Sequence, residues 1–186
     1  MRKVIYSMSV SLDGFVETPN REIDWVLVDE ELHTFFNDQA REMGLFLYGR
    51  RMYELMVDHW PTADMVTSNP AYIVEYARIW KDMPKVVFSK TLDRVAWNSR
   101  LVREDITGEL TKLKGQAGKD LSIGGPGLAS TLVRLGLVDE YQLFVNPIVL
   151  GGGTSFFPSL PHPLNLRLIE TRTFGSGVVY LRYQAG

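Results

Sequence analysis

The sequence predicts an α/β fold with a mainly parallel sheet that is covered by helices on both faces. Two observations lead to this prediction. Short apolar segments typical of strands alternate along the chain with segments whose apolar residues recur at helical spacing. The last part of the chain is rich in strands, which favours an antiparallel addition at one edge of the sheet. The 186 residues show no repeat or linker, so we expect one domain over residues 1–186.

The first half of the chain contains the clearest alternation of strands and helices. Residues 4–10 predict a strand that ends at the loop Ser-Leu-Asp-Gly-Phe. Asp29 is expected to cap a helix that begins at residue 30 and is stopped by Gly44. The further elements expected here are a strand over 45–49, a short helix from 50, a helix over 71–81 and strands over 85–88 and 101–102.

The second half ends in a predicted hairpin. Residues 106–114 are amphipathic, and a strand over 121–123 is followed by a helix-like stretch over 128–137. After this helix come the segments 141–150, 151–158, 166–174 and 177–184, of which the last two are predicted strands. The last two are joined around Gly175–Ser176–Gly177, which is typical of a hairpin turn.

Composition excludes several functional classes. The net charge of −2 gives no reason to expect a nucleic-acid or membrane partner. Cysteine is absent, which fits a cytoplasmic protein. The N-terminal apolar run is interrupted by serines and ended by Asp13, so we do not interpret it as a signal peptide. The three histidines are far apart and are expected to be surface or hydrogen-bonded side chains, so no metal site is predicted.

The glycine cluster Ile-Gly-Gly-Pro-Gly at residues 123–127 allows two interpretations, a phosphate cradle or an ordinary corner. It lacks the Rossmann pattern, because Ser130 replaces the last glycine and no acidic residue follows about 20 residues later. No Walker motif or nucleophile elbow is present either. A nucleotide would therefore bind in a different manner.

Three further segments carry anion-binding residue types just after a predicted strand. Each also allows a plain interpretation as a turn, a solvated pair of arginines or a polar loop. Ligands of α/β sheets collect outside the carboxyl ends of strands, so the four segments together favour one anion site. The three segments are Ser-Leu-Asp-Gly-Phe at 11–15, Leu-Tyr-Gly-Arg-Arg-Met-Tyr-Glu at 47–54 and Val-Val-Phe-Ser-Lys-Thr-Leu-Asp at 86–93.

A further motif follows near the C-terminus, Asp-Glu-Tyr-Gln-Leu-Phe-Val-Asn-Pro-Ile-Val-Leu-Gly-Gly-Gly-Thr-Ser-Phe-Phe at 139–157. The order of these motifs along the chain resembles that of the dihydrofolate reductase-like superfamily. The resemblance is to the branch that contains the reductase domain of riboflavin biosynthesis, and it covers nearly the whole chain. It implies a three-layer α/β/α fold, a reductase that uses NADPH, and a homodimer. The zinc deaminase domain of the bifunctional riboflavin enzyme is not expected, because its cysteine ligands are missing.

The resemblance also implies a set of cofactor-binding residues. The second strand would bring a glycine and its basic neighbours to the phosphates, and the next strand would bring groups for the adenosine 2′-phosphate. The related enzymes often have a cis peptide between the two glycines of the cluster, and a strained bond is expected here. The residues concerned are Gly49, Arg50, Arg51, Ser89, Lys90, Arg103, Gly124, Gly125, Pro126, Gly127 and Leu128.

On the substrate side, the resemblance implies that the nicotinamide lies near the 11–15 loop and the turn that contains Gly152 and Thr154. Asp13 is our candidate for orienting the substrate or relaying a proton through water. Trp25 is expected either to cap the substrate pocket or to anchor a loop. Met52 stands where the family often has threonine, and methionine has no hydroxyl with which to make that residue's phosphate contact.

The sequence therefore predicts hydride transfer to a C=N or C=O group of a small heterocyclic or ribosylamino-type substrate. One alternative is the riboflavin-pathway reductase itself, whose phosphoribosylamino-pyrimidine substrate needs its own cationic phosphate site. The other is a nucleotide-binding protein of the same fold without catalysis. For the homodimer, the sequence suggests only the apolar C-terminal strands such as residues 141–149 as an interface.

Overall fold

A computed structural model describes residues 1–186 and has an eight-stranded sheet at its centre, in the order β5-β4-β3-β6-β1-β7-β10-β9. The first six of these strands are parallel to their neighbours, and β10 and β9 are antiparallel additions at one edge. A small second sheet pairs β2 with β8. The strands are β1 (Val4–Ser11), β2 (Phe15–Glu17), β3 (Met43–Gly49), β4 (Lys85–Phe88), β5 (Ser99–Val102), β6 (Asp120–Gly124), β7 (Glu140–Asn146), β8 (Thr154–Ser155), β9 (Leu166–Thr173) and β10 (Val179–Ala185).

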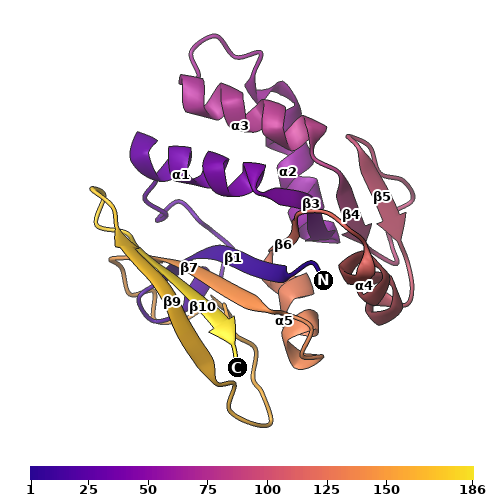
Figure 1. Cartoon of the computed structure of the whole chain (residues 1–186). Helices are drawn as coiled ribbons and strands as arrows, with labels where there is room; N and C mark the ends of the chain where they lie inside the picture. The colour runs from indigo at the N-terminus through magenta and orange to yellow at the C-terminus, as the bar shows by residue number, and fades with distance from the viewer.

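Helices cover both faces of the sheet, as the sequence predicted. Figure 1 shows α1 and α3 together on one side of the sheet and α5 on the other. Leucines of α4 and α5 belong to the same hydrophobic cluster, so α4 lies on the face of α5. The helices are α1 (Glu30–Arg41), α2 (Arg50–Ala63), α3 (Ala71–Asp82), α4 (Ile106–Gly115) and α5 (Pro126–Arg134). No helix is long and apolar enough to cross a membrane.

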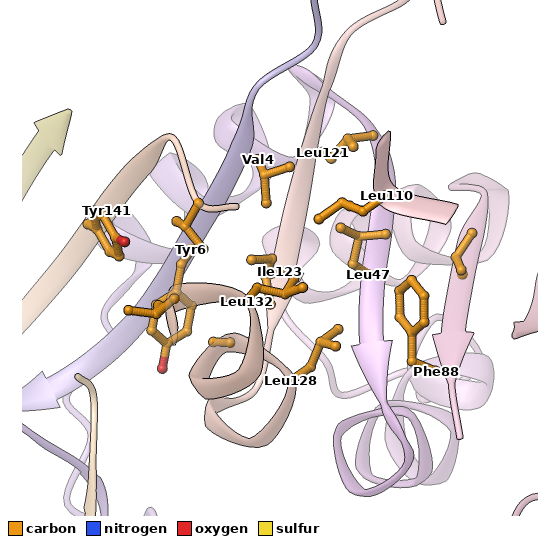
Figure 2. Close-up of a cluster of buried hydrophobic side chains, with 14 of the residues drawn as sticks. Val4, Tyr6, Leu47, Phe88, Leu110, Leu121, Ile123, Leu128, Leu132 and Tyr141 are labelled. Carbon is orange, nitrogen blue, oxygen red and sulfur yellow. The ribbon is translucent and has the colours of Figure 1, made fainter. Parts of the chain in front are cut away.

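The period of two along each strand divides its side chains between two cores. On β3, Leu47 packs in the cluster beneath α4 and α5, whereas Phe46 and Tyr48 pack against α1, α2 and α3. Figure 2 shows the first of these clusters, with Leu128 and Leu132 of α5 beside the sheet. The sheet is thereby fixed between two helical layers, and its strand ends are held in place as a rigid edge.

The element predictions are largely confirmed, with differences at helix ends. Asp29 caps α1, where its side chain accepts a hydrogen bond of 2.8 Å from the Leu32 amide. Gly44 does not stop this helix, because the helix ends at Arg41 and Gly44 is already within β3. The helix expected over 128–137 begins earlier, at Pro126, because proline is well suited to the first helical turn. The strand β2 was not predicted.

One further expectation, the cis peptide, is corrected. The chain has no cis peptide bond, so the bond between Gly124 and Gly125 is trans. The turn is made instead by Gly125, whose φ of +90° is readily adopted only by glycine. The segment 141–149, suggested as a dimer interface, overlaps β7, which is paired with β1 and β10 on its two edges. A second copy could therefore not add to an edge of β7, and the homodimer stays a prediction.

Candidate active site

The carboxyl ends of β3, β4, β5 and β6 meet at a cavity of about 1030 Å³, which we call the first cavity. Parallel neighbours bring these ends to the same edge of the sheet, where α/β proteins bind their ligands. All of the sequence-predicted cofactor residues line this cavity: Gly49, Arg50, Arg51, Ser89, Lys90, Arg103, Gly124, Gly125, Pro126, Gly127 and Leu128. The structure therefore brings together segments that lie far apart in the chain.

Two helices begin at the first cavity, and neither has a side-chain cap. Gly49 is the N-cap of α2 and Gly125 is the N-cap of α5, and no side chain accepts a hydrogen bond from either first turn. A Cβ added to Gly49 would lie 3.5 Å from the Leu128 Cβ, so the two helix starts are neighbours. Free backbone N–H groups and the positive ends of two helix dipoles therefore point at one place, which suits an anion such as a pyrophosphate.

The two glycines of the β6–α5 turn also permit close packing. A Cβ on Gly124 would lie 2.7 Å from a ring carbon of Tyr48, and one on Gly125 would lie 2.9 Å from the Cβ of Met52. Met52 therefore contacts the glycine turn directly, at the position where the family's threonine was expected to reach a phosphate. Gly127 differs, because nothing lies within 4 Å of an added Cβ and the residue is exposed at the cavity.

The cations of the first cavity are not equivalent. Arg50 is paired with Glu54 at 2.8 Å and Arg51 with Glu17 at 2.7 Å, so both are partly neutralised. Arg103 donates only to backbone carbonyls, at 3.3 Å to Lys90 and 3.2 Å to Asp93. The Lys90 ammonium has no ion-pair partner. Lys90 and Arg103 are thus the cations most available to an additional phosphate group.

Ser89 stands beside these two cations at the end of β4. Its Oγ accepts hydrogen bonds from the backbone amides of Thr91, at 3.2 Å, and Leu92, at 3.1 Å. These bonds fix the loop and leave the hydroxyl proton able to be donated to a ligand oxygen. The arrangement matches the expectation of a hydroxyl and an ammonium that leave a buried strand together.

Glu17 is a site residue that the sequence did not reveal. It lies on β2, is 6% exposed and lines the first cavity. Its carboxylate accepts hydrogen bonds from Arg51, at 2.8 Å, and from the Thr154 hydroxyl, at 2.7 Å. Burial acts to raise the pKa of Glu17, but the hydrogen bonds from Arg51 and Thr154 and the nearby arginine charges outweigh it, so the pKa is lowered. This carboxylate is therefore ionised and holds Arg51 and Thr154 at the cavity wall.

Three of the four predicted substrate residues lie outside the cavity linings. The Asp13 carboxylate accepts hydrogen bonds from Ser11 and from the backbone amides of Leu150 and Gly151, at 2.7, 3.1 and 2.7 Å. These bonds, that from Ser11 foremost, lower the pKa of Asp13 and tie two loops together. Gly152 belongs to the loop fixed in this way. Trp25 donates to the Glu22 carbonyl at 3.2 Å, which agrees with the loop-anchoring alternative.

A second cavity of about 550 Å³ lies between the sheet and the helices α1, α2 and α3. Five residues line both cavities and form the boundary between them: Met8, Val16, Ile23, Met52 and Gly124. The rest of the lining is mainly apolar and aromatic, with Phe36, Trp60 and Tyr76 among its larger side chains. A ligand in the second cavity would therefore meet the end of a ligand in the first.

His33 lines the second cavity, contrary to the expectation of a surface or hydrogen-bonded histidine. It is 7% exposed, and its Nδ1 atom is buried without a hydrogen-bond partner. Burial lowers the pKa of His33, although interaction with Asn37 and the charge of Glu75 oppose this effect. Helical spacing was the available signal, because positions 33, 36 and 40 fall on one face of α1, where Phe36 and Ala40 are apolar.

The arrangement as a whole can hold an extended phosphate-bearing ligand at the strand ends and a flat ligand beside it. A model of one protein family, described as the RibD C-terminal domain, matches residues 2–180. The chain belongs to the RibD C-terminal domain family. The two cavities therefore lie on a reductase-like fold.

Individual relatives agree with this membership. The uncharacterized protein YyaP of Bacillus subtilis (strain 168) is 35% identical over 183 residues, which cover 98% of this chain and 94% of YyaP. Among solved structures, a candidate riboflavin biosynthesis protein from Shewanella sp. PV-4 has a TM-score of 0.78 at 20% identity, with 100% of this chain and 99% of that chain covered.

The resemblance to dihydrofolate reductase is confirmed at the level of fold. Dihydrofolate reductase from Enterococcus faecalis, solved in complex with NADP(H) and RAB-propyl, has a TM-score of 0.66 at 13% identity. The match covers 99% of this chain and 96% of that chain. This member of the RibD C-terminal domain family thus has the dihydrofolate reductase-like fold that the sequence predicted.

Proposed function

We propose that the protein is an NADPH-dependent reductase that transfers a hydride to a small heterocyclic substrate. The observation that carries the proposal is the first cavity, where two uncapped helix starts and two unpaired cations meet at the carboxyl ends of parallel strands. The solved complex of the related dihydrofolate reductase with NADP(H) supports a nucleotide of this kind.

The residues of the first cavity fit the parts of NADPH. Gly49 and the turn 124–127 would hold the pyrophosphate through backbone N–H groups, because any larger side chain at Gly124 or Gly125 would collide with its neighbours. Ser89, Lys90 and Arg103 would hold the 2′-phosphate, whose charge distinguishes NADPH from NADH. NADPH supplies a hydride when it is bound.

The second cavity gives the substrate a place next to the reduced ring. Met8, Val16 and Ile23 on the shared boundary would exclude water around the reacting carbon, because their side chains are apolar. Thr154 and the Glu17–Arg51 pair would fix the wall of the first cavity near this boundary. Asp13, bonded to the 150–151 loop, would support the loop rather than exchange protons.

Titration with NADPH and NADH by calorimetry tests the proposal. We expect NADPH to bind at micromolar concentration, NADH to bind at least tenfold more weakly, and Arg103→Ser to remove most of that difference. Arg167→Ser is the matched control, because Arg167 is an exposed arginine on β9 that bonds only to Gln184. If NADPH fails to bind, the reductase function is wrong, and if the preference survives Arg103→Ser, the role given to Arg103 is wrong.

The alternative of a nucleotide-binding protein without catalysis makes a different prediction. Such a protein would bind NADPH and would leave its absorbance unchanged in the presence of heterocyclic carbonyl and imine compounds. Oxidation of bound NADPH by such a compound, with stoichiometric reduced product, would support the reductase.

A further inference from the structure

The second cavity has a wall without charge. None of its lining residues is a lysine, arginine, aspartate or glutamate. Its polar groups are neutral side chains such as Ser7, Gln39 and Gln142, together with His33 and two tyrosines. A phosphate buried here would lack a cation to offset its loss of hydration, and such burial is strongly unfavourable.

The walls are rich in aromatic side chains. The Trp60 and Tyr76 rings lie 4.4 Å apart between centroids, and the His33 ring lies 5.7 Å from Tyr76 and 6.1 Å from Phe36. Aromatic side chains pack on planar groups through their faces and edges. This part of the cavity therefore favours an aromatic heterocycle over a flexible sugar phosphate.

Two buried polar atoms on α1 lack hydrogen-bond partners, His33 Nδ1 and Asn37 Oδ1. The two residues are one helical turn apart, and the amide nitrogen of Asn37 is already bonded to Tyr72 and Glu75 at 2.9 and 2.7 Å. A neutral imidazole carries one proton, and we assign it to Nδ1, because Asn37 lies one turn along α1 and its side chain interacts with that of His33. The other ring nitrogen is then an acceptor.

From these observations we propose that the second cavity binds an uncharged, unphosphorylated aromatic heterocycle, which donates an N–H hydrogen bond to the imidazole of His33. The inference rests on the proposed reductase function only in treating this ligand as the substrate. A riboflavin-pathway intermediate that carries a ribosyl phosphate is a poor fit to this cavity. His33 is a substrate-positioning residue in this proposal.

Binding measurements with defined probes test the inference. Quinazoline-2,4-dione is flat, neutral and has N–H donors, whereas its 1,3-dimethyl derivative has none. We expect the dimethyl derivative to bind about tenfold more weakly to the wild type, and the difference to vanish in His33→Leu. In wild-type protein saturated with NADPH, uridine 5′-monophosphate should not bind at millimolar concentration.

A control variant and folding measurements show whether a lost difference between the two probes comes from the His33 side chain or from unfolding. His59→Leu is the matched control, because His59 is exposed and does not line the cavity, and it should retain the tenfold difference. Thermal unfolding of His33→Leu and His33→Gln shows whether either substitution disrupts folding, and His33→Gln should retain part of the difference because glutamine has an acceptor oxygen.

The inference is overturned if quinazoline-2,4-dione does not bind, if the two probes bind wild type equally, or if the difference persists in folded His33→Leu. Binding of uridine 5′-monophosphate beside NADPH would also overturn it, in favour of a phosphorylated substrate. The probe measurements are repeated without NADPH, so a failure of NADPH binding alone affects the proposed function and leaves this inference standing.

Discussion

The two cavities are built by different means although they share a wall. The first is formed largely by backbone at strand ends and helix starts, with cations added from loops. The second is formed by side chains that project from the sheet and three helices into one hydrophobic layer. A backbone site tolerates changes of side chain and fails when its shape or charge is altered, whereas a side-chain site is also part of the core that stabilises the fold.

The largest expected effect is on the first cavity. Gly127→Asp should weaken NADPH binding by more than about 100-fold, or about 2.7 kcal/mol, because it places a carboxylate where the pyrophosphate is proposed to lie. The fold should be unaffected, since an added Cβ meets nothing and an acidic residue suits the first turn of a helix. Calorimetry and thermal unfolding check the two parts. Gly127→Ala is the control and should bind NADPH within a few-fold of wild type.

This variant also tests the separation of the cavities. Gly127 does not line the second cavity, so Gly127→Asp should bind quinazoline-2,4-dione as wild type does when NADPH is absent. A parallel loss of both ligands would contradict the view that the two cavities are constructed independently. Gly125→Ala is unsuitable for the same purpose, because its Cβ would collide with Met52 and its φ is positive.

A substitution in the wall of the second cavity should reduce stability. Trp60→Ala is expected to lower the free energy of unfolding by about 2 kcal/mol, because a half-buried aromatic side chain that packs against Tyr76 is lost. Lys90→Ala in the first cavity should change it by less than about 0.5 kcal/mol, since Lys90 is exposed. Urea denaturation measures both. Equal losses in the free energy of unfolding for the two variants would contradict the distinction between a backbone site and a core site.

Glu17 should make a pH-dependent contribution to the stability of the folded protein. Its pKa in the folded protein is below the ordinary value of 4.5, so the stabilisation is present above 4.5 and is lost as the pH falls through the folded pKa. Glu17→Gln should therefore lose less stability than wild type between pH 5 and about pH 3, as measured by denaturation at each pH. The exposed residue Glu54 provides the control variant Glu54→Gln, which should follow the wild-type curve.

The smallest effect is expected at Asp13. Asp13→Asn should change the affinity for NADPH by less than about twofold, because Asp13 does not line either cavity and asparagine can still accept a hydrogen bond. Cofactor titration measures this directly, and turnover with an identified substrate extends the measurement. A loss of turnover of about 100-fold or more with affinity unchanged would restore Asp13 to the catalytic role that the sequence suggested.

The first cavity could be predicted from the sequence because its signals are local. Each signal comes from residues that are adjacent in the sequence: glycines after a strand, arginines at a helix start and a Ser-Lys pair at a strand end. The rule that parallel strand ends share an edge then brings these segments together. Glu17 gave no such signal, because its partners Arg51 and Thr154 are distant in the chain and β2 has only three residues.

The second cavity could not be predicted from the sequence for a related reason. Phe36, Trp60 and Tyr76 come from three helices, and apolar residues at helical spacing indicate a core without showing that a space remains within it. His33 is one of three scattered histidines in the sequence, and it is the packing of α1 against α3 that places it beside Tyr72 and Tyr76. The cis peptide was inferred from the resemblance alone, and the trans bond with a positive φ at Gly125 makes the same turn.

The position of Met52 on both cavities has a thermodynamic consequence. Its side chain contacts the 124–125 turn on one side and lines the second cavity on the other, and a flexible thioether readily changes its rotamer. If a ligand in one cavity selects a rotamer that suits the other ligand, the two bind cooperatively. Such coupling is reciprocal: the factor by which the nucleotide strengthens the heterocycle is the factor by which the heterocycle strengthens the nucleotide. One side chain would thereby make the affinity of each cavity for its ligand depend on whether the other cavity is occupied.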